Sequence, residues 1–228
     1  MRLKGILLGQ SVRFLGLLEP HGGIYAPDFL KAIQEQYSFV TVPKSLEEFD
    51  RNKGINFGHG KFTLPGGEKL AALRSIVIDR LQIYVNGIVA ETRGSVEDVD
   101  LFVDDLIEWS IRTFGTQIDP SVPIVSRYLS NVEVEMQNPL VKFRQQGLEL
   151  IAKSLSKKFT AYGVEVPLFE LTRFTLHTDS TALKVPNPTQ FRLERREGFE
   201  FGANVFFSSA ALKTGDHLEL LEAIESQP

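Results

Sequence analysis

Cysteine is absent from this chain of 228 residues. Without a thiol the protein has no disulfide, no thiolate nucleophile and no cysteine ligand for zinc or an iron–sulfur cluster. The redox compartment is left open for the same reason. Tryptophan occurs once and methionine twice, whereas phenylalanine occurs 17 times. We therefore expect a core of phenylalanine rings packed with leucine, isoleucine and valine.

Long hydrophobic runs are also missing. No stretch approaches the roughly 18 consecutive apolar residues that a membrane-spanning helix needs. The N-terminal residues Met1–Gln10 combine positive charge with an apolar run of only three residues, and no small-residue cleavage site follows, which is not typical of a signal peptide. We therefore expect a soluble, cytoplasmic protein with no membrane partner.

The charge balance has no basic excess. Lysine and arginine number 25 against 29 aspartates and glutamates, which gives a formal charge of −4 and a sequence pI of about 5.7. A protein that mainly binds nucleic acid usually has a net basic field or a basic stripe, because phosphate contacts supply much of the affinity. Nucleic acid is therefore not the favoured partner. The 43% hydrophobic content is enough for a globular core.

A hairpin signal lies at Asn86-Gly87. The dipeptide separates two apolar runs, residues 81–85 and 88–92. Asn-Gly between such runs predicts a two-residue hairpin turn, because both residues tolerate positive φ.

A helix signal follows directly. Ser95 stands three residues before Asp98 and predicts an N-cap, and Gly115 predicts the C-terminal end of a helix over Val96–Phe114. Its apolar residues recur every three or four positions and predict one stripe that packs on a sheet. We expect its acidic residues to form a solvated face: Asp98, Asp100, Asp104, Asp105 and Glu108.

The two prolines in Asp119–Pro123 predict a boundary between halves 1–118 and 124–228. Beyond it, the pattern predicts a strand at 127–136 and a second amphipathic helix at Pro139–Tyr162. The apolar stripe of that helix comprises Val141, Leu148, Ile151, Leu155 and Phe159. The other predicted elements are one or two irregular strands within 3–18, helices at 28–37 and 215–225, a helical turn at 45–53, and strands at 39–42, 55–57, 61–64, 168–177, 190–196 and 200–207. This order predicts an α+β fold, with mostly antiparallel sheet packed on two main amphipathic helices and two halves of similar element order.

The glycine-rich segment Gly54–Lys61 does not fit a phosphate-binding loop. Five residues separate its first glycine from the Gly-Lys pair, and Phe62 stands where a hydroxyl would hold magnesium. The segment also leads into a strand pattern, so a glycine-rich hairpin or bulge is the better interpretation.

His177 and Asp179 are two residues apart on a predicted strand, hence on one face. A histidine and a carboxylate can bind a metal or act as a base with its orienting group, but two ligands are too few for a metal site. A hydrogen-bonded pair at a strand end is therefore the favoured interpretation of His177 and Asp179. His217, near the start of the last helix, could join His177 in a composite site only through folding.

Arginines gather in the region 171–196. Arg173, Arg192 and Arg196, interleaved with phenylalanines, could bind the phosphate of a nucleotide or a phosphorylated metabolite. Glutamates lie between the arginines, so cross-strand ion pairs on a solvent-facing sheet are the competing explanation.

The sequence contains no catalytic motif, no metal-ligand spacing and no cofactor loop, and no motif names a family. Our leading hypothesis is a non-enzymatic binding or assembly protein that associates with a protein partner or with itself. The alternative is an enzyme or binding protein for a nucleotide or phosphorylated metabolite, with Arg173, His177, Asp179, Arg192 and Arg196 as ligand-binding residues.

Overall fold

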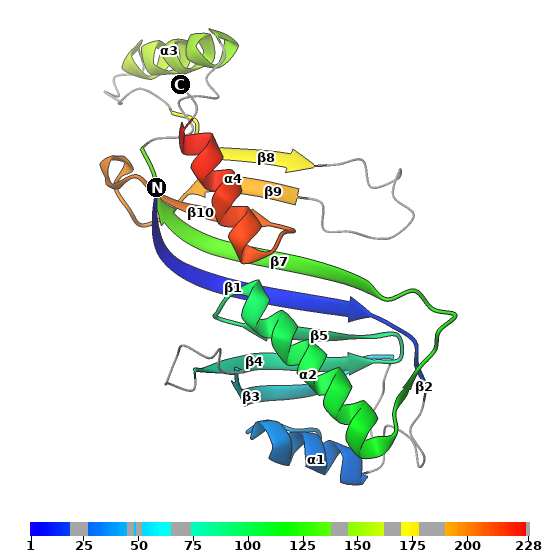
Figure 1. Cartoon of the computed structure of the whole chain (residues 1–228). Coiled ribbons are helices and arrows are strands. Elements are labelled where there is room, and N and C mark those ends of the chain that lie inside the picture. Colours follow the sequence, from blue (N-terminus) through cyan, green and yellow to red (C-terminus); the bar gives the residue numbers. More distant parts are fainter. Residues whose placement is uncertain are drawn as a thin grey trace. The chain divides into compact units, whose positions relative to one another are not determined.

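The computed structural model describes residues 1–18, 27–44, 48, 52–64, 74–137, 146–161, 170–177 and 190–226. These residues form four α-helices and an eight-stranded antiparallel sheet, which confirms the predicted α+β class (Figure 1). The elements in chain order are β1 (Arg2–Phe14), β2 (Leu17–Leu18), α1 (Pro27–Tyr37), β3 (Ile55–Thr63), β4 (Ser75–Tyr84), β5 (Gly87–Thr92), α2 (Val96–Phe114), β6 (Gln117–Ile118), β7 (Val125–Glu135), α3 (Gln146–Ala161), β8 (Arg173–His177), β9 (Gln190–Arg195), a 3-10 turn (Phe201–Ala203), β10 (Val205–Ala210) and α4 (Thr214–Ser226).

The strands of the main sheet pair in the order β3-β4-β5-β1-β7-β10-β9-β8, and β2 pairs with β6 in a separate two-stranded sheet. Contacts divide the chain into two compact units. The large unit comprises Ile6–Asn131 and Ala211–His217, and the small unit comprises Met1–Gly5, Val132–Ala210 and Leu218–Pro228. Neither unit is continuous in sequence. The predicted division into halves 1–118 and 124–228 stays a prediction.

Helix α2 begins and ends where the sequence predicts. The Ser95 side chain accepts a hydrogen bond from the Asp98 amide at 3.1 Å, which satisfies one of the free N–H groups of the first turn. At the other end Gly115 adopts the left-handed conformation, with φ of 66°, and its N–H donates to the Ile111 carbonyl. Local sequence chemistry thus fixes both ends of this helix.

The core of the large unit lies between helices α1 and α2 and one face of β3, β4 and β5. Phe102 of α2 is fully buried, and its ring centroid lies 5.1 Å from that of Tyr37 and 5.6 Å from that of Phe62. The Tyr37 hydroxyl donates to Asp105 at 2.8 Å. Buried aromatic residues of this core are Phe29, Tyr37, Phe39, Phe57, Phe62, Phe102 and Trp109. The expected phenylalanine-rich core is present in this unit.

The β4–β5 hairpin turns one residue earlier than predicted. Tyr84 pairs with Gly87, so the turn residues are Val85 and Asn86, and neither has a positive φ. Gly87 is instead the first residue of β5, where a Cβ atom would lie 2.5 Å from the Arg13 carbonyl oxygen. The glycine is therefore needed for the close approach of β1, and the predicted turn at Asn86-Gly87 is wrong by one position.

The glycine-rich segment lies within a strand, where the sequence predicted two short ones. Strand β3 runs through Gly58-His59-Gly60, and His59 adopts a positive φ of 56°. Strand residues change face at this point, since Phe57 and Gly60 are both buried. A Cβ on Gly60 would lie 2.4 Å from the ring of Phe39. The glycines thus serve packing at a kink in the strand.

Strands β8, β9 and β10 of the small unit pair in antiparallel fashion. The strand predicted over 200–207 is corrected: Phe201–Ala203 forms a 3-10 turn, Asn204 adopts a positive φ, and β10 begins only at Val205. A left-handed residue cannot sit within a regular strand, which explains the later start.

Helix α3 is the described part of the second predicted amphipathic helix, and residues 139–145 and 162 of that prediction lie outside the described ranges. Its apolar stripe is exposed. Ile151 is 57% exposed and Leu155 is 37% exposed. We call Leu148, Ile151 and Leu155 the α3 stripe. Leu150 lies about 140° to 160° around the helix from Leu155 and Leu148 and about 100° from Ile151, outside the α3 stripe.

Candidate functional site

The predicted arginine site lies on β8 and β9. In the antiparallel register Arg173 is opposite Glu194, Thr175 is opposite Arg192, and His177 is opposite Gln190. Directly opposed residues and alternate residues of one strand share a face. The structure therefore brings Arg173, Arg192 and His177 to one face of the strand pair, together with Glu194.

Glu194 bonds two of these arginines. Arg173 Nε donates to its carboxylate at 2.7 Å, and Arg192 Nη2 donates at 2.5 and 2.6 Å. Arg196 Nε pairs with Glu133 of β7 at 3.1 Å. A phosphate would have to displace these carboxylates from the guanidinium groups. The charges of these three arginines are therefore balanced by Glu194 and Glu133. This agrees with the interpretation of the sequence as cross-strand ion pairs.

A hollow of about 610 Å³ lies at one end of the β8–β9 pair, lined by Thr172, Arg173, Glu194, Arg195, Arg196, Glu197, Gly198, Phe199 and Phe201. The rings of Phe199 and Phe201 are about half exposed. Arg195, largely buried, donates to the Phe201 carbonyl at 2.8 Å and holds its guanidinium carbon 4.6 Å from the Phe201 ring centroid. The hollow thus offers half-exposed rings beside arginines that already have acidic partners, an arrangement suited to stacking a planar group.

The histidines that the sequence singled out lie in different environments. His177 is exposed at the end of β8, and Asp179 lies outside the described residues. His59 is exposed on β3, whereas His217 is fully buried in the first turn of α4. Among the residues that the structure describes, no group of three or more histidine, aspartate or glutamate side chains could hold a metal ion.

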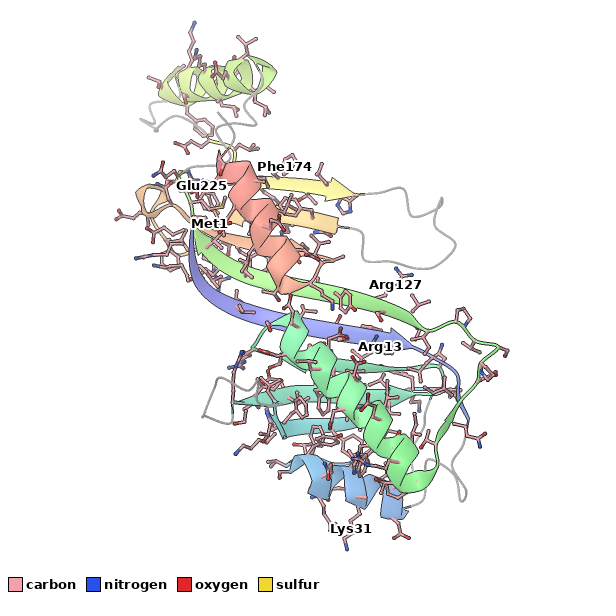
Figure 2. All side chains as sticks on the ribbon, viewed as in Figure 1. Met1, Arg13, Lys31, Arg127, Phe174 and Glu225 are labelled. Atoms are coloured by element: carbon pink, nitrogen blue, oxygen red, sulfur yellow. The ribbon has the colours of Figure 1, made fainter. Side chains whose placement is uncertain are left out.

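Sequence analysis missed a polar cluster around Asp100 in the large unit. The buried Asp100 carboxylate of α2 accepts from Ser11 Oγ at 2.7 Å and Arg13 Nη2 at 2.8 Å, both on β1. It also accepts from Tyr128 Oη and Lys213 Nζ, each at 3.2 Å. Figure 2 shows Arg13 on β1, beside helix α2. The carboxylate therefore links α2 to β1, to β7 and to the segment before α4.

We expected the acidic residues of α2 to form a solvated face, and this expectation is wrong for two of them. Asp98 and Asp100 are buried, whereas the Asp104 side chain is half exposed and pairs with Arg13 at 2.7 Å. Burial raises the pKa of Asp104, aided by the charge of Asp100 and opposed by that of Arg13. Burial opposes the charged form of Lys213, but the hydrogen bond to Asp100, the charge of Asp100 and the interaction with Tyr128 together outweigh this, and the pKa of Lys213 is raised. Arg13 and Lys213 thus balance the charges of the Asp100 and Asp104 carboxylates. Such a balanced cluster holds structural elements together.

The first turn of α4 is tied to the first turn of α2. The Val96 amide donates to Thr214 Oγ1 at 2.9 Å, and the Gly215 amide donates to Glu97 Oε1 at 2.9 Å. Each helix therefore caps a free N–H group of the other.

His217 lies next to this contact. Its Nδ1 is 3.1 Å from Ser130 Oγ, and both residues are fully buried. Burial lowers the pKa of His217 to about 4. The imidazole is therefore neutral at pH 7, and it contributes to packing and hydrogen bonding in its uncharged form.

No signal in the sequence could have found these ties. Ser11 and Arg13 share a strand face, but their distance from Asp100 along the chain is 87 residues or more. Only the pairing of strands and the seating of α2 bring them together.

No family model matches the chain, and no curated protein is significantly similar to it. None of the described helices is both long enough and apolar enough to span a membrane.

Proposed function

We propose that the chain is a non-enzymatic binding or assembly protein, acting as a subunit of a larger complex or as a homo-oligomer. The observation that supports this proposal is the exposed α3 stripe, with Ile151 57% exposed. An amphipathic helix normally turns its apolar stripe to a core, and exposed apolar patches mark interaction surfaces.

Helix stability adds to this argument. Helix α3 has 16 residues, and an isolated helix of about 12 to 15 residues is marginal in water. Covering apolar area contributes about 25 cal/mol for each Å² removed from water. A partner that covers Leu148, Ile151 and Leu155 would therefore stabilise the helix as it binds.

The test is gentle purification from the cells that make the protein, followed by the mass of the native complex. We expect the wild-type chain to carry bound protein and Leu155→Asp to lose it. Leu150→Asp is the matched control, because Leu150 is more exposed than Leu155 and lies outside the α3 stripe on the same helix. Loss of bound protein in both variants, or in neither, would count against the α3 stripe.

Catalysis would contradict the non-enzymatic part of the proposal. The measurement is a broad activity screen of the wild-type chain, repeated on His177→Ala and Asp179→Ala. A reproducible turnover that either substitution abolishes would overturn it.

A second candidate is a binding protein or enzyme for a nucleotide or phosphorylated metabolite. The observation in its favour is the hollow beside Arg173 and Arg196, with the half-exposed rings of Phe199 and Phe201 at its wall. A ligand phosphate would take the arginines from Glu194 and Glu133, and a base would stack on a ring.

A thermal-shift screen against nucleotides and sugar phosphates tests this candidate. A ligand at about 100 times its Kd adds about 2.7 kcal/mol to the free energy of unfolding. The stabilisation should disappear in Arg173→Gln and Arg196→Gln, whose arginines line the hollow, and persist in Arg80→Gln, whose arginine is ion-paired with Glu91 in the large unit. No shift with any compound would leave this candidate without support.

A further inference from the structure

Strand β8 forms one edge of the main sheet (Figure 1). The Arg195 amide of β9 donates to the carbonyl of Thr172, directly before β8, at 2.8 Å. In an antiparallel pair, residues whose backbone groups point to the neighbouring strand alternate with residues whose groups point away from it. The even-numbered residues of β8 therefore direct their N–H and C=O groups to β9. Those of Arg173, Thr175 and His177 point to the open edge.

These edge groups have no hydrogen-bond partner in the part of the chain that the structure describes. The opposite edge of the sheet, strand β3, is different, because Val40 and Thr41 bond to Gly58 there. A row of unpaired donors and acceptors on a regular strand is a template for another strand. The β8 edge therefore fits a partner in extended conformation.

The apolar side chains of β8 show which strand would fit. On one face Phe174 is opposite Leu193, and Leu176 is opposite Phe191, so each cross-strand pair joins a ring to a leucine. Leu176 is nevertheless 54% exposed. A strand that continues both rows would place a ring opposite Leu176 and a leucine opposite Phe174.

Strand β8 of a second copy has these side chains in the right order. A two-fold axis at Thr175 pairs all five residues of β8 with those of the second copy and sets Phe174 opposite Leu176 in both apolar rows. Because Thr175 points its N–H and C=O to the edge, the two copies of this residue exchange both hydrogen bonds. On the other face Arg173 meets His177 and keeps its bond to Glu194, so no two arginines are directly opposed.

We propose that the chain forms a two-fold dimer through antiparallel pairing of β8 with β8 of a second copy. The dimer rests on the proposed function, since it supplies one surface of a homo-oligomer, and it does not involve the α3 stripe. The interface is isologous and closed, so association stops at two copies. Two five-residue strands bury less than the roughly 1,200 Å² of a stable interface, so the dimer fraction rises with protein concentration.

A proline at the centre of the contact tests the backbone pairing. Thr175→Pro removes an N–H that points to the edge, and proline is tolerated on an edge strand at such a position. Both central hydrogen bonds are lost, so the Kd of the dimer should rise at least about tenfold. Thr175→Val keeps the N–H and should dimerise like the wild type. Light scattering at increasing concentration measures each variant against 25.6 kDa, the mass of one chain.

A second pair of variants tests the apolar rows. Leu176→Asp places a carboxylate opposite the Phe174 ring of the second copy and should also raise the Kd at least about tenfold. Val77→Asp is the matched control, because Val77 is 55% exposed on β4 of the large unit, and it should not change the Kd. Circular dichroism checks that each variant remains folded.

Introduced cysteines test the register, because the chain has none of its own. Directly opposed residues of a hydrogen-bonded antiparallel pair have Cα atoms about 5.5 Å apart, a separation that a disulfide spans. Under oxidation Thr175→Cys should therefore link to its own copy. Arg173→Cys and His177→Cys should each stay unlinked alone and should link to each other when the two variants are mixed.

A wild-type chain that stays at 25.6 kDa at every concentration would overturn the inference. Dimers that persist in both Thr175→Pro and Leu176→Asp, or Arg173→Cys linked to itself, would also overturn it. If a chain that does not self-associate still carries another protein after gentle purification, the inference fails while the proposed function stands. If it carries nothing, both fail.

Discussion

Helices α2 and α3 have the same kind of sequence pattern and different environments. Both carry apolar residues at three- and four-residue spacing. In α2 the stripe is buried and Phe102 packs among other rings, whereas in α3 the stripe is exposed. The period of a pattern predicts that a helix has an apolar face. It does not predict whether this chain or another molecule covers that face.

The largest expected effect is the loss of a ring from the α2 core. Phe102→Ala should lower the free energy of unfolding by about 3 to 5 kcal/mol, because the cavity cannot be filled by its ring neighbours. Leu155→Ala in α3 should cost less than about 1 kcal/mol, as for other exposed positions. Urea unfolding measures both costs, followed by the fluorescence of Trp109, the one tryptophan, for the large unit and by circular dichroism for the small unit that contains α3. Similar costs for the two substitutions would remove the distinction between the helices.

The pH dependence of the large unit should show the next largest effect. The pKa of His217 is about 4 in the folded protein, against 6.5 for an ordinary histidine. Between these values the unfolded chain binds a proton that the folded chain does not, so stability falls as pH falls from 6.5 to 4. The loss should reach about 3 kcal/mol at pH 4 and be absent above pH 6.5.

The matched control for this prediction is a second histidine of the large unit. His217→Asn should remove most of the pH-dependent loss. His59→Asn should retain it, because His59 is exposed and asparagine tolerates its positive φ. An unchanged pH profile in His217→Asn would contradict the assignment to the buried imidazole.

A smaller effect is expected at the polar tie of α2. Asp100→Asn should cost about 1 to 3 kcal/mol, because Arg13 and Lys213 lose a charged acceptor inside the large unit. Asp104→Asn should cost less than about 1 kcal/mol, since that carboxylate is half exposed. Urea unfolding at pH 7 compares the two variants. Equal losses of unfolding free energy in the two variants would mean that the contribution of Asp100 does not depend on its burial.

Local chemistry explains which parts of the fold were predictable. The ends of α2 follow from Ser95 and Gly115 alone, because a cap and a left-handed glycine act within one turn. The predicted position of the β4–β5 turn was wrong because Gly87 is needed for the close approach of β1 and not for the turn. The residues next to Gly87 in the sequence do not indicate that contact. Apolar residues that recur with a period of 2 or 3.6 predict strands and helices, but they do not predict hydrogen bonds between residues far apart in the chain.

The candidate sites were also predictable only in part. The sequence predicted that Arg173 and Arg192 would lie on strands, and it named glutamate as their competing partner, but only the register identifies Glu194 as the shared one. The cluster around Asp100 was beyond prediction, because its members come from α2, β1, β7 and the segment before α4. Residue Asp179 of the predicted ligand site lies outside the described residues, and its role stays a prediction.

Amide hydrogen exchange of α2 and α3 in one sample tests the central claim most directly. In the dilute, unassociated 25.6 kDa chain we predict slow exchange throughout the buried half of α2 and fast exchange along α3, because an uncovered helix opens with little cost. Exchange along α3 should slow when the chain is assembled. Equally slow exchange in both helices of the unassociated chain would contradict the account, because the α3 stripe would then already be covered.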